Sequence, residues 1–122
     1  MHRQRILILG QTKDNTYEIR NLLDQRRFEL EIALSSETAR IILSTRRMDV
    51  LVVHTEAVGE PLFDFLQFLE DADIDLPIVL MGEQAGALRE RTFRPEVSIT
   101  TFEKPYAAEE LANVFAELAC RA

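Results

Sequence analysis

Apolar residues in this chain gather in five short runs, of two kinds, that predict β-strands. Three runs, residues 5–10, 49–54 and 76–81, are apolar at almost every successive position. Because side chains alternate between the two faces of a sheet, such a run predicts a strand that is buried on both faces. The run at 28–34 largely alternates apolar and acidic residues, as an edge strand does, and the run at 97–102 is more polar than the central three.

Apolar residues at helical spacing occupy the segments between these runs. Asp14 and Asn15 are predicted to cap the first helix, and Ser35-Ser36 the second. Pro61 suits the first position of a third helix, whereas the segment 84–94 has the weakest helical pattern. The predicted inward-facing residues are, in chain order, Ile19, Leu22 and Leu23; Ala39, Ile42 and Leu43; Leu62, Phe65, Leu66 and Leu69; and Leu111, Val114, Phe115 and Leu118.

Strands that alternate with helices along the whole chain predict a single α/β domain over residues 1–122. Five βα units with right-handed crossovers form a doubly wound parallel sheet, and the continuous and alternating runs favour the flavodoxin-like strand order 2-1-3-4-5. In this fold the carboxyl ends of the first, third, fourth and fifth strands converge at one edge, where ligands bind. The residues predicted to meet there are Gly10, Gln11, His54, Gly82 and Lys104.

Three segments at these strands resemble the receiver domains of bacterial two-component response regulators (CheY-like), and the likeness extends over essentially the full length. Lys104-Pro105-Tyr106 is similar to that family's Lys-Pro-aromatic signature. Residues 48–54 resemble the third strand, which carries the phospho-acceptor aspartate, and residues 76–80 resemble the fourth. The resemblance implies a signalling domain in which Lys104 holds the position of the lysine that pairs with the acceptor phosphate.

Compared with that family, this chain lacks most of the residues that take part in phosphoryl transfer. Gly10 and Gln11 stand where the family has two magnesium-binding acids, and His54 stands where it has the acceptor aspartate. Gly82 takes the place of the switch threonine or serine, and Thr101 that of the switch aromatic residue. Magnesium prefers carboxylate oxygens, and phosphoryl transfer relies on the metal to neutralise charge. We therefore predict a degenerate receiver, or pseudo-receiver, that is not an enzyme.

Other roles are open to His54 and Lys104. The simplest role for His54 is structural, and the alternatives are phosphorylation of the imidazole or metal binding together with Glu56 and Glu83. Lys104 can form a structural ion pair with a nearby glutamate. The chain has no G-x-G-x-x-G motif, no P-loop and no Ser-His-Asp arrangement. We therefore predict no cofactor and no resident metal.

Charge and composition narrow the range of partners. The net charge of −7 at pH 7 repels phosphate backbones, so direct binding of nucleic acid is not expected. No apolar run is long enough to span a bilayer, which argues against membrane insertion. The single cysteine, Cys120, fits a reducing compartment. We therefore expect a cytoplasmic domain with a protein partner.

A partner surface is predicted from Thr101 and from the aromatic residues that helix and strand periodicity leave unexplained. These aromatic residues are Phe63, Phe68, Phe93 and Tyr106. We expect a regulatory domain that works without phosphorylation, through a homodimer or through docking to another protein, in a bacterial transcription regulator. The alternative is a small-molecule-sensing module that binds its ligand at the carboxyl edge near His54 and Lys104.

Overall fold

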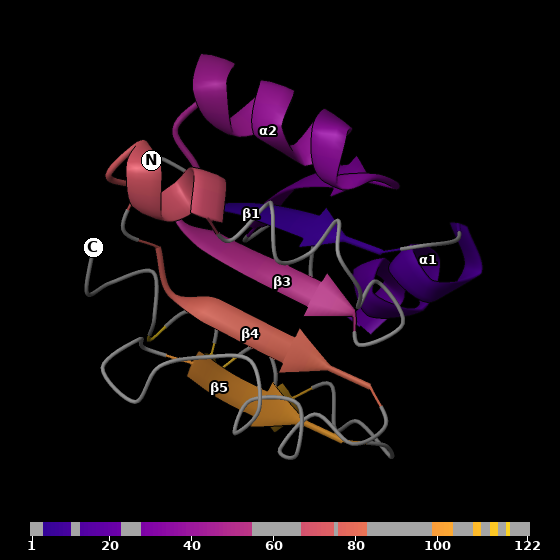
Figure 1. Cartoon of the computed structure of the whole chain (residues 1–122). Coiled ribbons are helices and arrows are strands. Elements are labelled where there is room, and N and C mark those ends of the chain that lie inside the picture. The colour runs from indigo at the N-terminus through magenta and orange to yellow at the C-terminus, as the bar shows by residue number, and fades with distance from the viewer. Residues whose placement is uncertain are drawn as a thin grey trace.

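Five strands form one parallel sheet in the computed structural model of this protein (Figure 1). The model describes residues 4–10, 13–22, 28–54, 67–74, 76–82, 99–103, 109–110, 113–114 and 117. The strands are β1 (Gln4–Leu9), β2 (Phe28–Ala33), β3 (Val50–His54), β4 (Ile78–Met81) and β5 (Ile99–Phe102). Their order is β2-β1-β3-β4-β5, and every neighbouring pair is parallel. The predicted flavodoxin-like strand order is confirmed.

The continuous apolar runs in the sequence form central strands, and the run that alternates apolar and acidic residues forms the edge strand β2. In β3 all residues from 50 to 53 are fully buried, with exposed fractions of 0%. In β2 the four residues between Phe28 and Ala33 are only half-buried. A central strand is covered on both faces and an edge strand is not, so the sequence patterns follow directly from position in the sheet.

Two apolar clusters, one on each face of the sheet, explain why the central strands are apolar throughout. The first cluster joins alternate strand residues to α2 (Ser36–Thr45) and to the helical residues 67–71. It includes Leu7, Leu51, Val53, Leu80, Ala39 and Leu69. The second joins the other strand residues to α1 (Lys13–Leu22), and it includes Ile6, Ile8, Val50, Val52, Val79 and Ile19. Each central strand therefore contributes side chains to two cores.

The predicted inward faces of the helices are confirmed where the structure describes them. Ile19, Ala39 and Leu69 are buried, and Ile42, Leu43 and Val114 are half-buried against the two clusters. The remaining predicted inward-facing side chains lie outside the described part of the chain: Leu22, Leu23, Leu62, Phe65, Leu66, Leu111, Phe115 and Leu118. No helix among the described residues is long and apolar enough to cross a membrane.

The start of α1 differs from the prediction. The helix already includes residue 13, so Asp14 and Asn15 lie in its first turn and do not precede it. A carboxylate is also favourable within the first turn, because it faces the positive end of the helix dipole. The residue type therefore marks the helix start correctly to within one turn, but it does not identify the cap itself.

Ser35 caps α2 as predicted. It has extended dihedral angles, φ −150° and ψ 157°, and its Oγ accepts a hydrogen bond from the Thr38 N–H at 3.2 Å. Ser36 is the first helical residue. The Ser35 hydroxyl satisfies one of the four N–H groups that have no partner within a helix.

Replacing this cap is expected to destabilise the domain measurably. Ser35→Ala should lower the free energy of unfolding by about 1 kcal/mol, because the Thr38 N–H loses its acceptor. Urea denaturation measures the change. Ser44→Ala, at an exposed position within the same helix, is the control and should be neutral or slightly stabilising. Equal stability of the two variants would argue against the capping role.

The helical residues 67–71 end in a compact hydrogen-bonded turn. Asp73 adopts φ 56°, its N–H donates to the Glu70 carbonyl at 3.2 Å, and the Ile74 N–H donates to the Leu69 carbonyl at 2.9 Å. This pair of bonds is the Schellman arrangement, which commonly accompanies an apolar contact across the helix end. Leu69 and Ile74 both belong to the first apolar cluster. The helix end is thereby fixed against the sheet.

Charged residues at the amino ends of the strands form a separate set of contacts. On β2, Glu29 pairs with Arg5 at 3.5 Å, and Glu31 pairs with Arg46 at the end of α2. Asp49, just before β3, accepts the Arg5 N–H at 2.8 Å through its Oδ2, and its own N–H donates to the Arg5 carbonyl at 2.8 Å. These contacts fix the start of β1 between its two neighbours.

Candidate functional site

The carboxyl edge of the sheet brings together the described members of the predicted site. In register, Leu9 lies beside Val53, and Met81 lies between His54 and Phe102. Gly10 directly follows β1 and Gly82 directly follows β4. The parallel strand ends visible in Figure 1 therefore place Gly10, His54 and Gly82 at one edge. Gln11 and Lys104 lie outside the described residues.

His54 ends the central strand and is almost wholly enclosed, with an exposed fraction of 5%. It is the only polar or charged side chain that is buried in the described part of the chain. The strand alternation that takes Val50 and Val52 into the second cluster puts His54 on the same face. An imidazole that is almost wholly enclosed has little contact with solvent, which favours a structural role over a reactive one.

Gly82 has a backbone conformation that favours glycine. Its φ is 131°, and its N–H donates to the Phe102 carbonyl at 3.0 Å. A residue with a β-carbon clashes with its own backbone in this region of φ. A threonine or serine could therefore not take this place without a change of backbone conformation. The turn after β4 requires a residue without a side chain.

Gly10 and Thr101 are further members of the predicted set of residues that the structure describes. The Gly10 N–H donates to the Ala33 carbonyl at 3.1 Å, which continues the β1–β2 pairing by one residue. Thr101 is half-buried on β5 in register with Leu80. No cluster of three or more His, Cys, Asp or Glu side chains that could hold a metal ion occurs among the described residues. At the end of β3 the acceptor position therefore holds no carboxylate, and the exposed Glu103 after β5 is not part of a metal-ligand cluster among the described residues.

The predicted partner surface is described only in part. Phe68 is half-buried and packs against the first apolar cluster, with the Arg40 guanidinium carbon 5.5 Å from its ring centroid. Phe63, Phe93 and Tyr106 lie outside the described residues.

Two pockets lie away from the carboxyl edge, and sequence patterns did not indicate either of them. One, of about 300 Å³, lies at the amino ends of the strands and is lined by charged residues that already pair with one another, together with Met48. The other, of about 540 Å³, lies between α2 and the helical residues 67–71. The only signal for the second was the aromatic residue Phe68, because its other lining residues have ordinary surface character.

No protein-family model and no curated protein sequence matches this chain. Solved structures do match it in fold. The receiver domain of the Francisella response regulator 1452 is 16% identical, with 98% of each chain covered and a TM-score of 0.77. The signal receiver domain of an HD domain-containing protein from Pseudomonas fluorescens Pf-5 is 16% identical over 99% of this chain and 90% of that one, with a TM-score of 0.81.

A longer protein also matches over part of its length. Full-length FixJ from B. japonicum is 17% identical, and the alignment covers 99% of this chain and 59% of that one with a TM-score of 0.79. At these identities the likeness concerns the fold.

Proposed function

Because this chain has the fold of response-regulator receiver domains, we propose that it is a receiver-like regulatory domain that works without phosphorylation. It is a single domain over residues 1–122, it acts in the cytoplasm through a homodimer or a protein partner, and it catalyses no reaction. It does not bind nucleic acid directly. The domain belongs to a longer bacterial regulator of transcription.

The observation that carries this proposal is the chemistry at the end of β3. An acyl phosphate requires a carboxylate, and the position that resembles the acceptor holds the buried His54. The nearby glycines contribute no side-chain ligand, and magnesium binding in proteins usually draws on one or two carboxylates. Gly82 adds independent support, because its φ of 131° disfavours a residue with a hydroxyl-bearing side chain.

Regulation through protein contacts is supported by what the fold retains. The sheet and both apolar clusters are intact, so the domain keeps a rigid framework on which a partner surface can be presented. A signal receiver domain of similar fold is part of an HD domain-containing protein, and full-length FixJ is matched over 59% of its length. A small-molecule site at the carboxyl edge has less support, because Gly10, His54 and Gly82 are all buried.

The test is exposure of the purified domain to magnesium with acetyl phosphate, and separately with beryllofluoride. We expect no stoichiometric gain of a phosphoryl group by intact mass spectrometry and no change in the amide spectrum with beryllofluoride, because no acceptor carboxylate lies at the end of β3. A conventional receiver domain treated in parallel is the positive control. Stoichiometric modification, or a saturable response to beryllofluoride, would contradict the proposal. Light scattering tests the expected dimer.

A further inference from the structure

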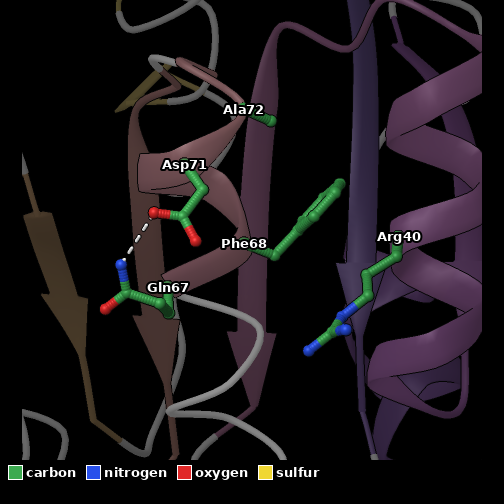
Figure 2. A pocket seen from close by; sticks show the side chains of 5 residues that line it. All are labelled: Arg40, Gln67, Phe68, Asp71 and Ala72. Carbon is green, nitrogen blue, oxygen red and sulfur yellow. Dashed lines mark hydrogen bonds between the residues drawn. The ribbon is translucent and has the colours of Figure 1, made fainter.

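The pocket between α2 and the helical residues 67–71 combines a cation with an aromatic wall (Figure 2). It is a shallow hollow of about 540 Å³ that is widely open to solvent. Its lining residues are Arg40, Gln67, Phe68, Asp71 and Ala72. Arg40 lies on α2, and the others lie in the helical residues 67–71 or, in the case of Ala72, in the turn that follows. Both elements cover the first apolar cluster, so the pocket is separate from the carboxyl edge of the sheet.

Arg40 carries a positive charge that no described carboxylate neutralises. Arg5 and Arg46 each form an ion pair with a glutamate on β2, whereas the described residues provide no such partner for Arg40. Its Nε is buried without a hydrogen-bond partner in the described part of the structure, and its guanidinium carbon lies 5.5 Å from the centroid of the Phe68 ring. The guanidinium is thus partly withdrawn from water, which strengthens any pairing with an anion at this place.

Asp71 limits the charge that this pocket can accept. Its Oδ1 accepts a hydrogen bond from Gln67 Nε2 at 2.9 Å, one turn earlier in the same helix. Figure 2 shows Phe68 between this pair and Arg40. No ion pair joins this carboxylate to Arg40 among the described contacts, and its negative charge lies on the pocket wall. Arg40 can offset one negative charge of a ligand, whereas a second negative charge would face Asp71 with no second cation among the described lining residues.

We propose that this pocket binds a small organic monocarboxylate with a flat apolar body. The ligand carboxylate accepts hydrogen bonds from the terminal guanidinium nitrogens of Arg40, an arrangement for which the planar guanidinium is well suited. The apolar body lies against Phe68 and Ala72, which line the pocket on the opposite helix. The inference concerns the α2 side of the domain and does not depend on the absence of phosphorylation.

The probe is benzoate, titrated into the full domain and followed by amide chemical-shift changes. We expect saturable shifts that centre on α2 and residues 67–72. Benzamide has the same shape without the charge and should bind at least roughly tenfold more weakly, because it loses the charge-assisted hydrogen bonds. Terephthalate, with two charges, should also bind more weakly than benzoate. Equal binding of benzoate and benzamide, or no saturable shift with benzoate, would overturn the proposal.

Matched variants distinguish binding of benzoate in this pocket from nonspecific binding of anions to the protein. Arg40→Gln should abolish the benzoate response, and Arg40→Lys should weaken it severalfold because a lysine cannot form the planar double contact. Arg47→Gln, at an exposed arginine after the same helix, should leave it unchanged. Thermal melts establish that each variant is folded. If folded Arg40→Gln binds benzoate like the wild type, or if inorganic phosphate produces the same shifts as benzoate, the proposed site is wrong.

Discussion

Gly82→Ser is expected to lower the free energy of unfolding by about 1–3 kcal/mol, although serine is a residue type that the resemblance to receiver domains implies for this position. The cause is the backbone: φ at Gly82 is 131°, a region that a residue with a β-carbon enters only with strain. The position is also buried, so the new hydroxyl needs a hydrogen-bond partner inside the protein. Urea denaturation of the variant and the wild type measures the loss.

Two further variants identify the origin of this loss. Gly82→Ala adds the β-carbon without the hydroxyl and should account for most of the destabilisation if backbone strain dominates. Gly10→Ala is the control at the equivalent place after β1, where no positive φ is found, and it carries only the cost of packing a methyl group. A Gly82→Ser variant as stable as the wild type would show that this turn tolerates a side chain.

Leu51→Ala is expected to destabilise the domain by about 3 kcal/mol, within the roughly 2–5 kcal/mol typical of a buried leucine. Leu51 is fully buried in β3, in register between Leu7 and Ile78, and it belongs to the first apolar cluster. Strands on both sides and helices above leave little freedom for the surroundings to close the cavity. The loss of apolar burial and the cavity therefore add together.

Ile41→Ala is the matched control for this substitution. Ile41 is an aliphatic residue on α2 with an exposed fraction of 60%, so its truncation should change the free energy of unfolding by less than about 0.5 kcal/mol. Chemical denaturation of both variants at one temperature gives the comparison. Similar losses for the two would mean that the first cluster is loosely packed.

The strand order could be predicted from the sequence because a strand buried on both faces is apolar at successive positions, whereas a strand buried on one face alternates apolar and polar residues. The run ending at His54 is apolar at successive positions because side chains of β3 enter both clusters. The segment 28–34 alternates because β2 lies at an edge. The convergence of Gly10, His54 and Gly82 then follows from parallel pairing alone.

The pocket beside α2 could not be predicted, for an equally physical reason. Arg40 and Phe68 belong to different helices, and periodicity within one helix says nothing about which side chain of the next helix lies opposite. The positive φ of Gly82 could not be predicted from the sequence either. A glycine can adopt many backbone conformations, and the residue type does not indicate which one is adopted. The exact start of α1 was missed because the residues that favour a cap, Asp14 and Asn15, lie inside its first turn.

The strand order has a consequence for how this domain folds while it is being synthesised on the ribosome. The three adjacent strands β2, β1 and β3 all lie within residues 4–54. β4 then joins the free side of β3, and β5 joins β4, in the order in which they are synthesised. No later strand has to insert between two that are already paired. We therefore expect β1, β2 and β3 to pair first during translation. Each later strand then pairs with the exposed edge of the sheet as it leaves the ribosome.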